Sequence, residues 1–305
     1  MTTQINYSIG IIGIGILGTA LKETFSSSKF CNISNISNIS NVICYDKYKN
    51  IGTNILDMNG CDIIFLCLPT EYDEYKKEYN KQEIYNVIEE LASYKYKGII
   101  IIKSTVEPET TVKLANMYKS LPLHIIHNPE FLSARTATED FKNQKQIILG
   151  IPHYNPQKLK TNTSSNTSNN MPKLINYLET FFSICFPLSK ISICSSTESE
   201  SIKLFCNSFY ATKVQYFTEI KLLCDKLEID YNNVKNLMLL NGWINPMHTD
   251  IPGHDGQISF GGKCFPKDIK ALNQVFKNLE VPNRVLESVI KENSIMRDDN
   301  AKFLN

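Results

Sequence analysis

Cys264 lies in a segment whose composition favours nucleophilic chemistry, Phe260-Gly261-Gly262-Lys263-Cys264-Phe265-Pro266-Lys267-Asp268. Because Pro is common in the first turn of helices, Pro266 predicts a helix that begins just after Cys264, with Lys267 and Asp268 about one turn on. Helix N-termini lower the pKa of a thiol and so make it a better nucleophile. Most of the other cysteines lie in apolar runs, as Cys67 and Cys206 do, where a buried inert thiol is the better interpretation.

A glycine-rich segment, Gly13-Ile14-Gly15-Ile16-Leu17-Gly18, follows an apolar run over residues 5–12 and precedes a helical pattern. Glycines at these positions allow a tight turn and let a pyrophosphate approach backbone N–H groups at a helix N-terminus. The next expected strand ends at Asp46, whose carboxylate would accept both ribose hydroxyls of NAD and repel a 2′-phosphate. An ordinary glycine-rich turn is the alternative interpretation.

Short hydroxylated residues follow two further apolar runs. Ser104 and Thr105 come after residues 98–102, and Thr70 comes after residues 62–68, with Pro69 between that run and the threonine. In an open α/β sheet the carboxyl ends of the strands line the ligand crevice, so all four residues are candidates for cofactor binding. Ser and Thr also cap helices, which is the simpler reading of the same pattern.

Three polar residues could act on a substrate. Glu130 follows another strand, in Asn128-Pro129-Glu130-Phe131-Leu132, where it is either a general base or a surface carboxylate. Lys203 and Asn207 are four residues apart in a helical pattern and therefore share a face. Their N–H groups could stabilise an oxyanion, and a solvated polar pair is the alternative.

These residues require a scaffold of alternating strands and helices. The apolar runs at 42–45, 62–68, 98–102, 123–126, 147–150 and 191–194 are separated by helical or turn-forming segments. This alternation predicts an α/β fold with a doubly wound, parallel, Rossmann-type sheet. We expect loop insertions near 32–41 and 154–173, and a solvated amphipathic helix over 71–97.

A long helix is predicted from about Thr197 to Leu227, and it opens an all-helical second domain. The predicted domains are therefore 1–196 and 197–305. One apolar stripe repeats at steps of three and four and is expected to be buried, whereas a second makes the helix apolar on more than one side. The first stripe is Phe205, Phe209, Thr212, Tyr216, Ile220, Leu223 and Leu227, and the second is Leu204, Ala211, Val214, Phe217 and Cys224.

Composition excludes several classes of protein. The chain has 305 residues with 32 Lys+Arg and 31 Asp+Glu, so no basic surplus favours nucleic-acid binding. No apolar run is long enough to span a bilayer, and the start of the chain lacks a signal-peptide pattern, so we expect a cytoplasmic protein with no membrane partner. Nine Cys without a C-x-x-C pair favour reduced thiols. Loop composition explains His248 and His254 near Asp250 and Asp255 better than a metal site.

The motifs, in this order, resemble the UDP-glucose/GDP-mannose dehydrogenase family over nearly the whole chain. The segment 260–268 is the most specific part of the resemblance. It implies NAD-dependent oxidation of a nucleotide-sugar alcohol, UDP-glucose to UDP-glucuronate, by two hydride transfers through a cysteine thiohemiacetal and thioester. GDP-mannose, another nucleotide sugar, and a non-catalytic nucleotide-binding relic remain alternatives, because the motifs do not read the base or the sugar.

The resemblance also implies roles for single residues. It makes Cys264 the nucleophile and Asp268 the base that handles water and protons, with Lys203 and Asn207 holding the oxyanion. Glu130 and Thr105 would assist deprotonation and hydrolysis. Residues expected to contact substrate are Phe131, Leu132, Lys203, Asn207, Phe260, Gly261 and Lys267.

Two positions depart from the family pattern. Ala134 stands where a second Glu is common, and Lys263 stands where an uncharged residue is common. The resemblance implies a homodimer through the long central helix. It also implies a third, C-terminal domain, which we expect to be absent because the sequence ends at Asn305.

Overall fold

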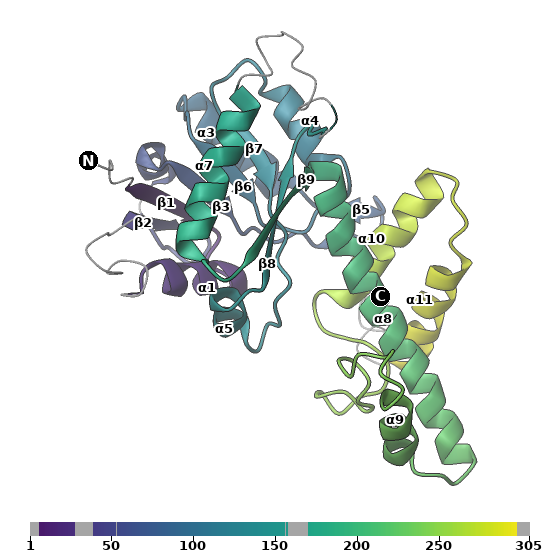
Figure 1. Ribbon diagram of the computed structural model, residues 1–305. Helices are drawn as coiled ribbons and strands as arrows, with labels where there is room; N and C mark the ends of the chain where they lie inside the picture. The colour runs from purple at the N-terminus through teal and green to yellow at the C-terminus, as the bar shows by residue number, and fades with distance from the viewer. Residues whose placement is uncertain (1–5, 28–38, 53, 156, 158–169, 298–305) are drawn as a thin grey trace. The chain divides into compact units, whose positions relative to one another are not determined.

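The computed structural model describes residues 6–27, 39–52, 54–155, 157 and 170–297. The chain divides into two compact units (Figure 1). Unit 1 comprises Met1–Thr70 and Asn80–Lys203, and unit 2 comprises Glu71–Tyr79 and Leu204–Asn305. The backbone therefore passes between the units three times, after Thr70, after Tyr79 and after Lys203.

Unit 1 is built on a seven-stranded sheet with the order β2-β1-β3-β6-β7-β8-β9. Neighbouring strands are parallel except β7 and β8, which pair antiparallel. The strands are β1 (Tyr7–Ile12), β2 (Ile39–Tyr45), β3 (Ile63–Leu66), β6 (Ile99–Ile102), β7 (His124–His127), β8 (Gln146–Ile151) and β9 (Lys190–Ser195). The prediction of a Rossmann-type sheet with seven strand-forming runs is confirmed.

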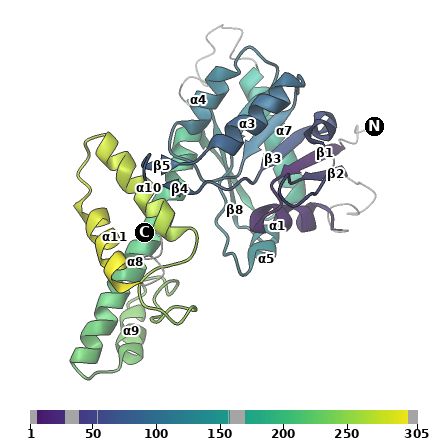
Figure 2. The same ribbon diagram turned by 180° about the vertical axis from the view of Figure 1, so that it is seen from behind.

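Helices cover both faces of this sheet because its central strands are apolar on both sides. In β3, Phe65 packs on one face with α1, α5 and α7, whereas Ile64 packs on the other with η1, α3 and α4. Accordingly α7 lies in front of the sheet in Figure 1, and α3 in Figure 2. The helices are α1 (Ile16–Phe25), η1 (Ile55–Gly60), α3 (Gln82–Ser93), α4 (Thr110–Met117), α5 (Ala137–Lys142) and α7 (Asn170–Cys185).

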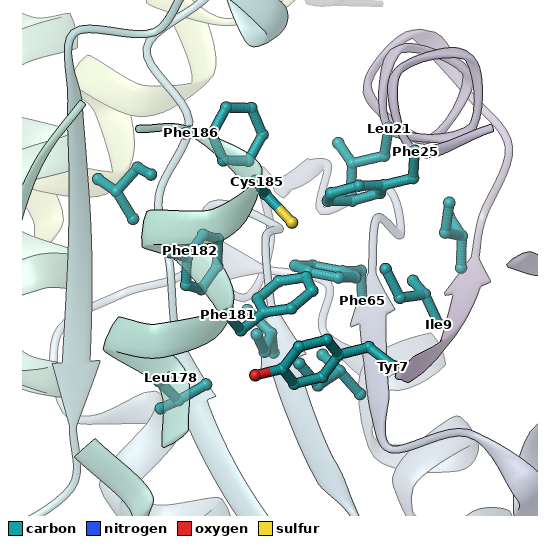
Figure 3. Close-up of a cluster of buried hydrophobic side chains, with 14 of the residues drawn as sticks. Tyr7, Ile9, Leu21, Phe25, Phe65, Leu178, Phe181, Phe182, Cys185 and Phe186 are labelled. Carbon is teal, nitrogen blue, oxygen red and sulfur yellow. The ribbon is translucent and has the colours of Figure 1, made fainter. Parts of the chain in front are cut away.

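The core on the α7 face is rich in aromatic side chains (Figure 3). Phe65 from β3 stacks on Phe25 from α1 with ring centroids 5.5 Å apart, and Phe181 from α7 meets the Tyr7 ring edge-on at 4.9 Å. Burying each such ring stabilises the fold by about 1.5–3 kcal/mol. This packing fixes β1 and α1, between which the glycine-rich turn lies.

Unit 2 is mainly helical. Its elements are the two-stranded hairpin β4 (Tyr72–Asp73) and β5 (Glu78–Tyr79), the greater part of α8 (Ser196–Lys226), and α9 (Tyr231–Leu239), α10 (Phe265–Asn278) and α11 (Arg284–Met296). The hairpin packs on α10, and Tyr79 shares a small apolar cluster with Leu204, Ala271 and Leu272. The predicted long helix is confirmed as α8, which begins in unit 1 and continues into unit 2.

Several local predictions differ from the structure. The stretch 71–97 is not one solvated helix: it contains the β4–β5 hairpin and then α3, whose apolar face is buried on the sheet. The predicted loop 32–41 lies largely outside the described residues, but its last three residues belong to β2. Likewise, most of the predicted loop 154–173 is outside them, and residues 170–173 belong to α7.

The burial of α8 is the reverse of the prediction. Phe205, Phe209 and Tyr216, from the stripe expected to be buried, are more than half exposed. The second stripe forms the core instead, with Leu204, Ala211, Phe217 and Cys224 buried. Both stripes are apolar at helical spacing, so the period alone could not say which of them faces the neighbouring helices.

Candidate active site

The glycine-rich turn between β1 and α1 has the geometry of an anion cradle. Gly13 has a φ of +90°, and a Cβ on Gly18 would lie 1.9 Å from the Gly13 carbonyl oxygen, so both positions require glycine. Gly15, the residue that caps α1, has no atom within 4 Å of an added Cβ, and no side chain caps its helix. The N-terminus of α1 therefore has open space beside Gly15 and no side-chain cap, as an approaching pyrophosphate needs.

A pocket of about 430 Å³ adjoins this turn in unit 1. Gly15, Ile16 and Thr19 line one side of it, and Lys49 and Arg135 bring positive charge to its wall. Ala134 also lines the pocket. The Leu17 side chain packs on the sheet core, which leaves only its backbone N–H to face the turn.

Asp46 follows β2 and is tied to the turn by its carboxylate. One oxygen accepts a hydrogen bond from the Ile14 N–H at 2.8 Å, and the other accepts from the N–H groups of Tyr48 and Lys49 at 3.0 Å each. Lys49 Nζ also donates to the Ile14 carbonyl. Asp46 therefore holds the turn in shape.

Hydrogen bonds join the segment that follows β3 to the segment that follows β6. Ser104 Oγ donates to the Leu68 carbonyl at 2.7 Å, and Thr70 Oγ1 donates to the Thr105 carbonyl at 2.7 Å. Thr70 and Ser104 are buried and Pro69 is exposed. The structure thus brings these four predicted residues together at the carboxyl edge of the sheet.

Glu130 and Lys203 form a nearly buried ion pair in unit 1. Lys203 Nζ lies 3.0 Å from Glu130 Oε1, and the two side chains are 5% and 14% exposed. Glu130 Oε2 accepts from the Leu132 N–H at 2.8 Å, and the Lys203 ammonium lies 5.5 Å from the centre of the Phe131 ring. The segment 130–132 and the start of α8 therefore meet around one charge pair.

Lys103 is a buried cation beside this pair that sequence reasoning did not single out as a site residue. Its Nζ donates to Asn128 Oδ1 at 2.8 Å, and Asn128 Nδ2 donates to the Ile148 carbonyl at 2.7 Å. Burial lowers the pKa of Lys103 to about 8, although nearby Cys67 and Glu130 oppose that shift. The sequence does hold a signal for this residue, because Lys103 directly follows the four consecutive isoleucines of β6.

In unit 2, Cys264 occupies the position before the first residue of α10. Its thiol-bearing side chain is exposed, and Pro266 lies in the first turn of the helix. The Asp268 N–H donates to the Cys264 carbonyl at 3.0 Å, so the carboxylate of Asp268 belongs to the turn that follows the thiol. The expected helix N-terminus at Cys264 is confirmed.

Three donors converge on the fully buried Asp268 carboxylate. The Tyr79 hydroxyl and Lys267 Nζ donate to Oδ1 at 2.5 and 2.6 Å, and Asn207 Nδ2 donates to Oδ2 at 2.6 Å. The Lys267 ammonium also lies 4.5 Å from the centre of the Tyr79 ring. Asn207 therefore bonds to Asp268 and Lys203 to Glu130, one pair in each unit. Tyr79 was missed because nothing in its local sequence marks it.

The segment before Cys264 is held inside unit 2. Phe260 is buried, and the Arg297 guanidinium occupies the space that a Cβ on Gly261 would need. Lys263 is exposed. Among the described residues, no three His, Cys, Asp or Glu side chains are grouped as a metal ion would need. Asp255 is ion-paired with Arg297 and Asp250 with Lys235.

Within the described part of the chain, no helix is long and apolar enough to cross a membrane. This finding concerns the helices of both units, including the 31-residue α8, which carries charged residues along its length.

Known proteins match both units. The NAD-binding domain of the UDP-glucose/GDP-mannose dehydrogenase family matches residues 40–163, and the central domain of that family matches residues 197–294. The UDP-glucose 6-dehydrogenase of Rickettsia bellii is 28% identical over 257 residues, which is 82% of this chain and 54% of that protein. UDP-glucose 6-dehydrogenase TuaD of Bacillus subtilis is 28% identical over 79% of this chain and 48% of its own length.

A solved structure shares the fold. The UDP-glucose dehydrogenase of Pyrobaculum islandicum superposes with a TM-score of 0.75 at 17% identity, covering 97% of this chain and 69% of that one. The chain spans about half the length of the curated relatives that it matches.

Proposed function

The chain belongs to the UDP-glucose/GDP-mannose dehydrogenase family, and on that premise we propose that it oxidises UDP-glucose to UDP-glucuronate with NAD. The observation that carries the proposal is the exposed Cys264 at the N-terminus of α10, followed one turn later by a buried carboxylate with three hydrogen-bond donors. A thiol and a carboxylate so arranged suit covalent capture of an aldehyde and its later hydrolysis.

The cofactor would be held by unit 1. The first amides of α1, together with Lys49 and Arg135, would bind the pyrophosphate, and Gly15 leaves it room. Asp46 would orient the ribose. Thr70 and Ser104, whose hydroxyls donate to the Thr105 and Leu68 carbonyls, would shape the crevice. NAD, when bound, accepts one hydride in each of the two oxidation steps.

The proposed reaction takes place at carbon 6 of the sugar and at the Cys264 sulfur. The 6-hydroxymethyl group loses a proton and a hydride to give an aldehyde. The Cys264 thiolate adds to the aldehyde carbon, and protonation gives a thiohemiacetal. Loss of a second hydride and a proton leaves a thioester, and attack by water breaks the C–S bond, releasing the carboxylate and the thiol.

The other side chains would serve these steps. The Lys203 ammonium and the Asn207 amide would stabilise the developing oxyanions. Glu130 and Asp268 would move protons, Asp268 for the hydrolytic water, with Thr105 assisting. Phe131, Leu132, Phe260, Gly261 and Lys267 would contact the nucleotide sugar.

The exposed stripe of α8 supports a further proposal, that two copies of the chain associate through this helix. Phe209, Tyr216, Leu223 and Leu227 repeat at helical spacing and are each more than half exposed. An apolar stripe of this kind is typical of a helix that packs against another helix.

The experiment is an absorbance assay of NADH formation by the purified chain, with UDP-glucose, GDP-mannose and UDP-N-acetylglucosamine in parallel. We expect two NADH per UDP-glucose consumed, none from Cys264→Ala, and unchanged turnover for Cys194→Ser, which alters a half-buried thiol in β9. If NADH forms with GDP-mannose and with neither of the other two sugars, GDP-mannose and not UDP-glucose is the substrate. NAD binding without turnover on any sugar would favour the non-catalytic alternative.

A further inference from the structure

The backbone just before Cys264 contains two successive glycines, Gly261 and Gly262, which allow it many conformations. Gly262 has a φ of +77°, and Ser259 on the other side of Phe260 has a φ of +59°. Glycines lose much conformational entropy when they are ordered, so such a segment needs contacts to hold a single shape. Two buried polar side chains supply them, one near the end of α11 and one directly after it.

Asn293 is the first of these side chains. It is buried, and its Nδ2 donates to the Phe260 carbonyl at 2.6 Å and to Ser259 Oγ at 2.8 Å. Ser259 Oγ in turn donates to Gln215 Oε1 at 2.5 Å, and the Ser259 N–H donates to Thr218 Oγ1 at 3.0 Å. The segment is therefore tied to both α11 and α8.

Arg297 is the second. Its side chain is 2% exposed, and Nη2 lies 2.9 Å from Asp255 Oδ2. A Cβ on Gly261 would lie 2.0 Å from Nη2 and 2.4 Å from Cζ of the same guanidinium, and nothing else is as close. Position 261 is glycine because the Arg297 guanidinium fills the volume beside it.

We propose that Asn293 and Arg297 are positioning residues that fix the backbone of residues 259–263 and so set the direction of the Cys264 thiol at the N-terminus of α10. The inference rests on the proposed function, because it assigns these two side chains to the proposed nucleophile. The reactivity of a thiol at a helix N-terminus depends on its distance from the first amides, so a loosened segment lowers that reactivity. Neither residue is expected to touch the substrate.

The test measures the alkylation rate of Cys264 by iodoacetamide in the intact chain, across pH 6 to 9, from the mass of its peptide. We expect Arg297→Ala and Asn293→Ala each to slow alkylation at neutral pH by about tenfold and to move the rate profile to higher pH. Arg297→Lys should recover part of the loss. Arg284→Ala, which removes an exposed arginine at the start of α11, should leave the rate unchanged.

A second comparison keeps the test decisive if Arg297→Ala unfolds part of the chain. Gly261→Ala alone should slow alkylation, because its Cβ collides with the guanidinium. In the Arg297→Lys background the same substitution should cost less, since the smaller head group leaves room. A folded Arg297→Ala protein that alkylates at the wild-type rate would overturn the proposal, as would an equal effect of Gly261→Ala in both backgrounds.

The alkylation rate needs neither NAD nor sugar. A chain that shows these alkylation effects but oxidises no nucleotide sugar would retain the positioning role and lose the proposed function. Normal turnover in a chain whose variants show no change in alkylation rate would retain the proposed function and reject the positioning role.

Discussion

The Tyr79 hydroxyl donates a 2.5 Å hydrogen bond to the Asp268 carboxylate, joining residues 189 positions apart in the sequence. Both side chains are fully buried, and the bond ties the β4–β5 hairpin to α10. Hydrogen bonds to buried charged groups are among the stronger ones in proteins.

Replacing Tyr79 by Phe tests this bond while keeping the ring. We expect the free energy of unfolding to fall by about 1.5–3 kcal/mol, because Asp268 keeps its burial and loses one of its donors. Urea denaturation followed by circular dichroism measures the change. The control is Tyr75→Phe, at a tyrosine that is 98% exposed in the same hairpin. An equally small effect of both substitutions would contradict the expectation.

Gly15 and Gly18 predict different consequences for the same substitution. Gly18→Ala should lower the free energy of unfolding by more than about 2 kcal/mol, because its Cβ collides with the Gly13 carbonyl. Gly15→Ala should fold normally, since Gly15 has an extended backbone and open space around it, but should weaken NAD binding about tenfold or more. Isothermal titration calorimetry with NAD measures this. If Gly15→Ala binds NAD with the wild-type affinity, the pyrophosphate does not bind beside Gly15.

Glu130 and Lys203 should show strong energetic coupling. Because the pair is nearly buried, Glu130→Gln or Lys203→Met alone should cost about 3–5 kcal/mol, and the double variant should cost less than the sum. The matched control is the exposed pair of Glu109 and Lys113, for which a double-mutant cycle should give less than about 0.5 kcal/mol. Equal coupling in the two pairs would show that burial of the first has no energetic effect.

Glu200 predicts a pH-dependent stability. Burial raises its pKa to about 7, with Glu107 adding to the shift and the two hydrogen bonds from Thr111 opposing it. Between pH 4.5 and 7 the folded chain thus holds a proton at Glu200 that the unfolded chain has released, so this group's contribution to stability falls as pH rises. The difference corresponds to about 3 kcal/mol.

Melting temperatures from pH 5 to 8 check this prediction. We expect the Tm of Glu200→Gln relative to the wild type to increase by about 5 °C over this range, because Gln does not titrate. Glu198→Gln is the control. The Ser195 hydroxyl and N–H hold the pKa of Glu198 below its usual value, so its Tm offset should stay constant. A constant offset for Glu200→Gln as well would mean an ordinary pKa at Glu200.

The exposed stripe of α8 predicts an effect on assembly. Phe209→Glu and Tyr216→Glu should convert a dimer into monomers, because a carboxylate would be buried without a partner in a helix-to-helix contact. Light scattering during size-exclusion chromatography measures the mass. Leu188→Glu, at a 97% exposed leucine in unit 1, should not change it. A monomeric wild-type chain would refute association through α8.

The sequence was most informative where chemistry is local. The glycine spacing at 13–18 follows from a turn between adjacent elements, and Pro266 marked the start of α10 just after Cys264, so both features could be predicted from a few residues. Seven apolar runs predicted the seven strands of the sheet, but not the antiparallel pairing of β7 with β8.

What the sequence could not predict depends on distant contacts. Tyr79 lies in a Tyr/Lys/Glu-rich stretch whose local pattern fits a solvated helix, and only packing against α10 makes it a partner of Asp268. Similarly, the guanidinium that fills the space at Gly261 comes from a residue 36 positions later. The stripes of α8 were reversed because tertiary packing, and not helical period, selects the buried face.

The β4–β5 hairpin has a consequence for how the chain is made. Residues 71–79 belong to unit 2 although the rest of unit 2 begins at Leu204. At a synthesis rate of about 5–20 residues per second, Tyr79 leaves the ribosome about 10–40 s before Asp268. By the end of that interval all seven strands of the sheet have been translated, while the buried tyrosine of the hairpin still has no carboxylate to bind. Unit 2 can complete its core only when its last helices have been translated.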